Sequence, residues 1–214
     1  MNSKLAALKE QYLAGTLSKS DFIHSALQNH KALFEYVDIT RTTQVKEILI
    51  AADGVAFVLG EERVRLYCPE NEARVAPIEV MNFNQYEPAE TRVMDLLTAN
   101  ALCILDVGAN IGLYAIRFAK RLPRARVYAF EPMPISHTFL QRNVAVNSVG
   151  DRVSCFNYGL SETSGTVDFY VSPGSGTNAS LLNVAAAQDA HRVVGLTLTM
   201  DQWTANQKVV PDFI

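Results

Sequence analysis

The fold is decided by the stretch Ile104-Leu105-Asp106-Val107-Gly108-Ala109-Asn110-Ile111-Gly112-Leu113-Tyr114. It has the pattern D-x-G-x-x-x-G between a short apolar run, which predicts a strand, and a segment with helical periodicity. The two glycines allow the backbone to turn tightly and to approach a ligand, because a Cβ would occupy that space. Ligands bind at the carboxyl ends of strands in parallel sheets. We therefore expect a ligand site at this loop.

The loop differs from the two common phosphate-binding motifs. The dinucleotide pattern G-x-G-x-x-G has a glycine two residues after its first, where this sequence has Asn110. The P-loop has a lysine where Leu113 stands. A carboxylate at Asp106 would repel a pyrophosphate, but it suits a ligand that carries positive charge.

A second acidic residue, Glu131, follows the next apolar run and lies 25 residues after Asp106. One strand–helix–strand step brings it beside the glycine loop at the same edge of the sheet. A carboxylate in that place can accept hydrogen bonds from both hydroxyls of a ribose. The loop and this acid together predict a nucleoside cofactor.

Beyond Leu102 the sequence alternates between strand and helix patterns, which predicts an α/β fold with a Rossmann-like parallel sheet. The expected segments are strands at 102–107, 126–130 and 153–158, helices at 113–121 and 135–146, a hairpin at 166–171 and an apolar run at 193–198.

The first 85 residues differ in pattern. Residues 3–36 have helical spacing, with Gly15 at a turn and Ser18-x-x-Asp21 as a capping box. The period then changes to two, and Asp53-Gly54 marks a hairpin turn in a small antiparallel meander. We expect residues 1–85 to form a helical and β-meander extension and residues 86–214 to form the core.

These motifs resemble the class I S-adenosylmethionine-dependent methyltransferases, and more narrowly the FkbM-type family. The resemblance runs from about Tyr86 to the C-terminus and is carried by Tyr86-Glu87-Pro88, Asp106 to Gly112, Phe130-Glu131-Pro132, Asn143-x-x-x-Asn147, Tyr158-Gly159-Leu160-Ser161 and Pro211 to Ile214. It implies O-methylation of a hydroxyl on a small molecule or sugar, with S-adenosylmethionine as the cofactor. It also implies which residues surround the cofactor: Asp106, Gly108, Asn110 and Gly112 around the methionine part, and Glu131 on the ribose.

The charge of that cofactor agrees with the sequence, because its sulfonium and amino groups are positive and Asp106 lies near. The end of the third strand would supply the adenine pocket, so Phe156, Asn157 and Tyr158 are candidates. Core packing is the competing interpretation of Phe156.

The sequence departs from the FkbM-type family after Ile214. In that family the segment continues into Lys-x-Asp-x-Glu-Gly and further strands. We therefore expect an incomplete sheet with an unpaired edge near Val193–Leu198 or Phe213, prone to homo-oligomerisation and inefficient in turnover. The alternative function is a catalytically inactive cofactor-binding or interaction module. A third, an NAD-dependent oxidoreductase, is opposed by Asn110.

Composition limits the partners. The net charge is −3, from 19 basic and 22 acidic residues that are well mixed, so charge-driven binding to nucleic acid is not expected. No apolar run reaches the roughly 18 residues of a membrane span, and the N-terminus does not read as a signal peptide. We expect a cytoplasmic chain without a membrane partner, and its three scattered cysteines as reduced thiols rather than disulfides or metal ligands.

Other polar residues are expected to be structural. Asn143 and Asn147 are interpreted as anchors for a loop, and Trp203 as a core residue. Glu87 and Glu90 are expected to cap the helix that begins near Pro88, with a ligand contact from Glu87 as the alternative. A few further residues show no catalytic partner, namely His24, His30, His137, Asp189 and His191.

Overall fold

The computed structural model describes residues 3–171, 179–180 and 191–214, and divides into two compact units, one ending at Thr42 and one beginning at Thr43. The expected division between residues 85 and 86 stays a prediction about domains. What the structure shows is that the meander packs within the larger unit. The expected loop at 172–180 lies mostly outside the described residues, and so does Asp189.

The smaller unit is a pair of helices, α1 (Lys4–Leu13) and α2 (Lys19–Thr42). The predicted cap of the second helix is confirmed, because the Ser18 hydroxyl accepts a bond from the Asp21 backbone N–H at 3.1 Å. Gly15 takes a positive φ of 73° in the connecting turn, and the rings of Tyr12 and Phe22 stack across the pair with centroids 5.0 Å apart. The helical prediction is confirmed, with α2 extending to Thr42.

The larger unit begins with the predicted antiparallel meander of β1 (Val45–Ala51), β2 (Gly54–Leu59) and β3 (Val64–Tyr67). Gly54 pairs with Ala51 at the predicted hairpin turn. Two helices follow, α3 (Ala76–Phe83) and α4 (Pro88–Leu97). Pro88 opens α4 as expected, whereas α3 was not predicted, since its eight residues are too few to show a clear helical period.

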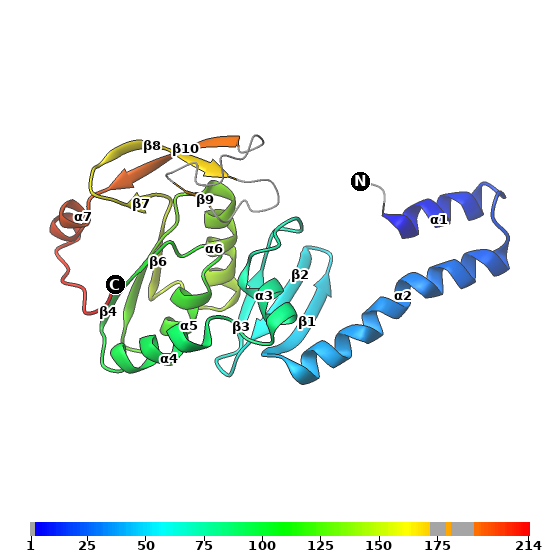
Figure 1. The fold of residues 1–214 in the computed structure, drawn as a ribbon, viewed down its shortest axis with the longest axis horizontal. Coiled ribbons are helices and arrows are strands. Elements are labelled where there is room, and N and C mark those ends of the chain that lie inside the picture. Colours follow the sequence, from blue (N-terminus) through cyan, green and yellow to red (C-terminus); the bar gives the residue numbers. More distant parts are fainter. Residues whose placement is uncertain (1–2, 172–178, 181–190) are drawn as a thin grey trace. The chain divides into compact units, whose positions relative to one another are not determined.

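The predicted parallel sheet is present as β4 (Cys103–Val107), β5 (Arg126–Phe130) and β6 (Val153–Phe156), in that order. The connecting helices are α5 (Leu113–Arg121) and α6 (Pro134–Val146). Both helices also contact β3, so they lie between the parallel sheet and the meander (Figure 1). The α/β class is confirmed, and the register places Asp106 opposite Ala129 at the carboxyl ends of β4 and β5.

The other face of the sheet is covered by aromatic side chains around α7 (Met200–Gln207). Trp203 is 1% exposed and packs with Leu105 and Phe130, as its predicted core role requires. Phe156 joins this cluster with its ring stacked on Phe130, at a centroid distance of 5.1 Å. Core packing is therefore what the structure shows for Phe156.

A second sheet has the order β7-β10-β8-β9, with β7 (Gly159–Leu160), β8 (Gly165–Val171), β9 (Ala179–Ser180) and β10 (His191–Leu198). The expectation that Val193–Leu198 forms an unpaired edge of the parallel sheet is wrong. This run pairs with β8 on one side and β7 on the other, because an antiparallel return onto β8 satisfies its backbone. Phe213 does lie beside the parallel sheet, in a parallel bridge with Ile104.

The side chains of Asn143, in α6, and Asn147, at its C-cap, form hydrogen bonds with the backbone of β3 as a neighbouring strand would. Asn143 is fully buried; its Oδ1 accepts from the Tyr67 N–H at 2.8 Å, and its Nδ2 donates to the Tyr67 and Ile111 carbonyls at 3.0 and 2.8 Å. One turn later, Asn147 makes the same pair of bonds to the backbone of Arg65. The predicted anchoring role is confirmed, and it also ties the glycine loop to the meander through Ile111.

Replacing Asn143 with alanine should lower the free energy of unfolding by about 2–4 kcal/mol, because three backbone groups lose their partner in a buried place. Asn147→Ala is the matched control, and water can reach its partners, so about 1 kcal/mol is expected. Urea unfolding of both variants measures the difference. Equal losses in the two variants would contradict the anchoring role assigned to Asn143.

Candidate functional site

A cavity of about 520 Å³ opens at the carboxyl ends of β4 and β5, a size typical of small-molecule sites. It is lined by Ala76, Tyr86, Glu87, residues 106–111, Leu113, Tyr114, residues 131–133, residues 159–161, Phe169 and Thr197. Four of the six predicted cofactor-binding residues are therefore brought together here: Asp106, Gly108, Asn110 and Glu131.

The glycine loop is fastened to the end of β5 by its own backbone. The N–H groups of Gly108 and Ala109 both donate to the Phe130 carbonyl, at 2.9 and 3.0 Å. The next N–H, of Asn110, donates to Oε2 of Glu131 at 2.9 Å. Gly108 and Asn110 have φ values of 82° and 49°, a left-handed conformation that glycine and asparagine tolerate best. The loop thus has a fixed shape.

Glu131 holds both sides of this edge together. It is 4% exposed, and its second oxygen, Oε1, accepts from the Met133 N–H at 2.8 Å. Burial raises the pKa of Glu131 to about 7, against the lowering effect of these two backbone bonds, and nearby Asp106 raises it further. A carboxylate oxygen can accept more than one bond. Glu131 can therefore accept ribose hydroxyls while it keeps its two backbone bonds. The sequence pattern did not show that Glu131 also fixes the glycine loop.

Asp106 lies at the end of β4, next to the first turn of α5. Burial raises its pKa to about 6, partly offset by a hydrogen bond from the Ala115 backbone N–H. Its Oδ2 is buried without a hydrogen-bond partner among the described residues, and so is Oδ1 of Asn110. Buried acceptors in that condition are costly. Both are groups that a ligand carrying positive charge or N–H donors would satisfy.

The cavity lining fits S-adenosylmethionine on these observations. The two unsatisfied acceptors suit its amino group and its positive charge. A Cβ built on Gly108 would meet no atom within 4 Å, so this glycine leaves space on the cavity side for a ligand to approach the backbone. No Lys, Arg or His belongs to the described lining, so positive charge in the cavity must come from the ligand.

Gly112 has a different physical role from the one predicted. A Cβ at Gly112 would lie 2.7 Å from Cδ1 of Leu140 and 3.3 Å from Cδ1 of Ile116, inside the core. The explanation that its missing side chain leaves room for the ligand is therefore wrong; it leaves room for α6 to pack on α5. Direct contact between Gly112 and the cofactor stays a prediction.

Asn157 lies just outside the cavity lining. Its Nδ2 donates to the backbone carbonyls of Glu131 and Pro132, at 2.9 and 3.3 Å, and so braces the turn that carries Glu131. Contact of Asn157 or Tyr158 with adenine stays a prediction.

Part of the wall is formed by Tyr86, Glu87 and Tyr114. Sequence reasoning gave Glu87 only as an alternative ligand contact and missed the two tyrosines. Glu87 occupies the N-cap position of α4 but makes no side-chain capping bond, so that expectation is wrong. Its Oε2 accepts instead from the Tyr114 hydroxyl at 2.6 Å. The motif Tyr86-Glu87-Pro88 was the available signal. The second sheet's contribution, through Phe169 and Thr197, left no such signal, because these residues have ordinary strand patterns.

The cysteines and His137 lie outside the cavity lining. Cys68, Cys103 and Cys155 are free thiols, as expected, and burial raises the pKa of Cys68 and of Cys155 to about 11. His137 is half-buried, and burial lowers its pKa. Among the described residues, no cluster of His, Cys, Asp and Glu could hold a metal ion, and no helix is long and apolar enough to cross a membrane.

The chain is similar in sequence to known methyltransferases. Residues 70–170 match the sequence family of the TRM5/TYW2 methyltransferase domain. The chain is 37% identical over 79 residues to Methyltransferase sdnD of Sordaria araneosa, covering 37% of this chain and 30% of that protein. It is 33% identical over 85 residues to 2-O-methyltransferase NoeI of Sinorhizobium fredii, a match that covers 40% of this chain and 34% of that protein. It is 30% identical over 184 residues to the antimetabolite synthetase AmbE of Pseudomonas aeruginosa, a match that covers 80% of this chain and 8% of that protein.

These similarities support an S-adenosylmethionine-dependent methyltransferase domain, with S-adenosylmethionine as the cofactor. The sequence family that matches is that of the TRM5/TYW2 methyltransferase domain, and the narrower FkbM-type family of the resemblance stays a prediction. The matched stretch spans about a third or less of each of these relatives.

The two raised carboxyl pKa values predict a stability that falls as pH rises. A carboxyl whose folded pKa exceeds its unfolded value stabilises the fold fully below the unfolded pKa, and this contribution is lost as pH rises through the folded pKa. For Asp106 that window runs from 3.8 to about 6. The free energy of unfolding of Asp106→Asn, relative to that of the native chain, should therefore rise by about 1–3 kcal/mol between pH 4 and pH 7. Urea unfolding without ligand at both pH values measures it, and a constant difference would contradict the burial of Asp106.

Gly108→Ala should mainly weaken ligand binding, whereas Gly112→Ala should mainly lower stability. Gly112→Ala is expected to lower the free energy of unfolding by about 2–4 kcal/mol, from a left-handed backbone and a clash with Leu140. Gly108→Ala carries only the backbone strain, about 1–2 kcal/mol, but places a methyl group in the cavity. Calorimetric titration with S-adenosylhomocysteine should show the larger affinity loss for Gly108→Ala. The reverse order would remove Gly108 from the ligand site.

Proposed function

We propose that the chain binds S-adenosylmethionine in the cavity at β4 and β5 and transfers its methyl group to a hydroxyl oxygen of a small molecule or sugar. The observation that carries this proposal is the composition of the lining, in which three carboxylates, Glu87, Asp106 and Glu131, are accompanied by no basic side chain among the described residues. Such a cavity attracts a cationic ligand and disfavours phosphates.

Each part of the lining has a role toward the cofactor. Glu131, at the end of β5, would accept the ribose hydroxyls while keeping its bonds to the Asn110 and Met133 backbone. Asp106, at the end of β4, would stabilise positive charge near the methionine part, and its unsatisfied Oδ2 would gain a partner. When bound, S-adenosylmethionine supplies a methyl carbon attached to a positively charged sulfur.

The protein's contribution to transfer is then mainly positional. The fixed glycine loop and the clamp of Glu131 hold the cofactor so that an acceptor oxygen can approach in line with the bond to sulfur. The leaving thioether needs no proton, so no general acid is required. The acceptor hydroxyl does lose a proton, and a base would assist that step.

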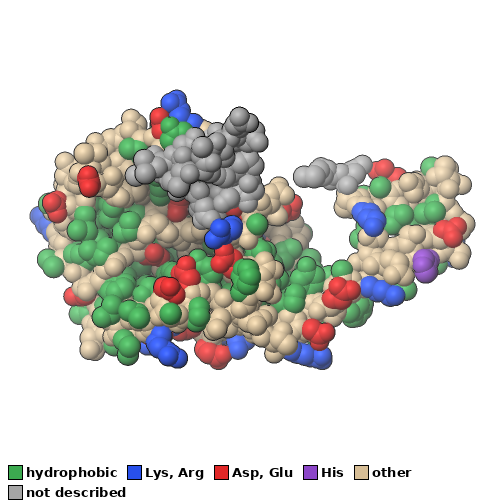
Figure 2. All heavy atoms as spheres, in the orientation of Figure 1, with side chains coloured by type: hydrophobic (Ala, Val, Ile, Leu, Met, Phe, Trp, Pro, Cys, Tyr) green, Lys and Arg blue, Asp and Glu red, His purple; other side chains and the backbone are tan. Residues whose placement is uncertain are grey.

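A hydroxyl acceptor is favoured by similarity to NoeI, whose name describes a 2-O-methyltransferase. The narrower FkbM-type relationship, which rests on the sequence motifs between Tyr86 and Ile214, is part of this proposal. A small acceptor is favoured by charge. Figure 2 shows basic side chains scattered among acidic and hydrophobic ones on the drawn face of the larger unit, and the chain has a net charge of −3. A phosphate-binding surface would concentrate Lys and Arg.

The proposal predicts that the chain binds S-adenosylmethionine and S-adenosylhomocysteine, but not NAD, in calorimetric titrations. Incubation with methyl-labelled cofactor and a panel of sugars and hydroxylated metabolites should yield a methyl ether, identified by mass spectrometry. Glu131→Ala should weaken binding at least about tenfold, because hydrogen bonds to a charged group and the loop clamp are both lost.

Three outcomes would contradict the proposal. NAD binding in place of S-adenosylmethionine would refute the cofactor. Label recovered on nitrogen or in RNA would refute the acceptor class. Cofactor binding without transfer to any hydroxyl would favour the catalytically inactive binding module.

A further inference from the structure

Glu87 has an unusual backbone conformation at the wall of the cavity. Its φ and ψ are 40° and 60°, in the left-handed region, although it is not glycine. Its carbonyl accepts the first bond of α4 from the Thr91 N–H at 2.9 Å, while its side chain caps nothing. Strained residues of this kind persist only when their surroundings hold them, and they concentrate at functional sites. The strained backbone therefore marks Glu87 as a candidate functional residue.

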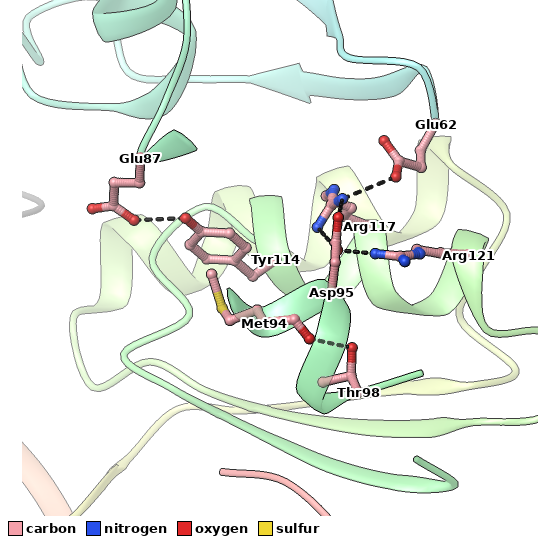
Figure 3. Close-up of polar contacts among 8 residues, drawn as sticks. All are labelled: Glu62, Glu87, Met94, Asp95, Thr98, Tyr114, Arg117 and Arg121. Atoms are coloured by element: carbon pink, nitrogen blue, oxygen red, sulfur yellow. Dashed lines mark hydrogen bonds and ion pairs between the residues drawn. The ribbon is translucent and has the colours of Figure 1, made fainter. Parts of the chain in front are cut away.

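The side chain is directed toward Tyr114, in the first turn of α5, as Figure 3 shows. The Tyr114 hydroxyl donates to Oε2 of Glu87 at 2.6 Å. The pKa of Tyr114 is raised by burial and by this bond, so the phenol keeps its proton and remains the donor. The Tyr86 phenol also forms a hydrogen bond with the Glu87 side chain. Two tyrosines therefore orient this carboxylate, whose oxygens can each accept more than one bond and so can still accept from a ligand.

Ion pairs farther along the two helices fix this arrangement. Arg117 contacts Asp95 of α4 at 2.7 Å and Glu62 of the meander at 3.1 Å, and Arg121 pairs with the same Asp95 (Figure 3). These contacts lie along one side of α5, beyond Tyr114. Because α4 is held against α5 in this way, Glu87 is kept next to Tyr114 at the cavity wall.

The three carboxylates of the lining have different partners. Glu131 clamps the loop through two backbone bonds and lies where the ribose is proposed to bind. Asp106 is half-buried at the strand end next to α5, and its Oδ2 is buried. Glu87 comes from a different element, is exposed toward solvent, and interacts with the phenols of Tyr114 and Tyr86. The cofactor's sulfonium has no hydrogen to donate, whereas its α-ammonium group has three.

We propose that Glu87, oriented by Tyr114, binds the α-ammonium group of the cofactor's methionine part. The inference depends on the proposed function and assigns to that same cavity its subsite for the amino acid end. It makes Glu87 a specificity residue, which distinguishes ligands that carry the aminobutyrate chain from those that end at the thioether.

The experiment compares three ligands by calorimetric titration at neutral pH. S-adenosylmethionine has the ammonium and the sulfonium, S-adenosylhomocysteine has the ammonium only, and 5′-methylthioadenosine has neither. Glu87→Gln should weaken the first two ligands equally, by about tenfold, and leave methylthioadenosine within about twofold. Tyr114→Phe should show the same selectivity with a smaller loss of about threefold, since it only frees the carboxylate.

Two further variants serve as controls. Glu90→Gln removes a carboxylate from the same first turn of α4 that does not line the cavity, and no affinity should change. Glu131→Ala should weaken all three ligands, because each contains the ribose. Circular dichroism and thermal unfolding confirm that the variants are folded.

Several outcomes would overturn the inference about Glu87 alone. A loss confined to S-adenosylmethionine would indicate only a general charge effect on the sulfonium. Equal losses for all three ligands, or no loss for any, would place the ammonium elsewhere, as would ammonium selectivity that is lost in Asp106→Asn but kept in Glu87→Gln. If the native chain binds none of the three ligands, the proposed function itself fails, and the inference with it.

Discussion

The rest of the site depends on one buried carboxylate, that of Glu131, which accepts backbone N–H groups from both sides of the sheet edge. One bond fixes Asn110 of the glycine loop, and the other fixes Met133 at the start of α6. Together with the Phe130 carbonyl, which receives Gly108 and Ala109, it gives the loop a single conformation. A site formed this way is preorganised, so little ordering is left for the ligand to induce.

The same clamp places negative charge where water is largely excluded. Buried Glu131 lies near half-buried Asp106, and the pKa values of both carboxyls are raised. Without a ligand this is unfavourable, and two buried acceptor oxygens of the lining have no hydrogen-bond partner among the described residues. A cationic nucleoside would relieve both conditions at once. The same negative charge therefore lowers the stability of the unliganded fold and favours binding of such a ligand. Glu87 adds a third carboxylate to this lining.

The sequence predicted the parts of this structure that depend on local pattern. Apolar runs predicted the strands that end at Asp106 and Glu131. The strand–helix–strand connection predicted that the two residues lie at the same edge of the sheet. The packing of Leu140 against Gly112 could not be predicted, because it joins α5 and α6 through tertiary contact. The bond between Glu87 and Tyr114 spans 27 residues and was hidden for the same reason. The second sheet was misassigned because β10 has an apolar pattern that suits either sheet.

A crystal structure of the native chain with S-adenosylhomocysteine tests the central claim most directly, that the acidic edge formed by Asp106, the glycine loop and Glu131 is the cofactor site. We expect both ribose hydroxyls within hydrogen-bonding distance of Glu131, while Glu131 keeps its bonds to the Asn110 and Met133 N–H groups. A ribose bound elsewhere, or bound only after Glu131 has released the loop, would contradict it.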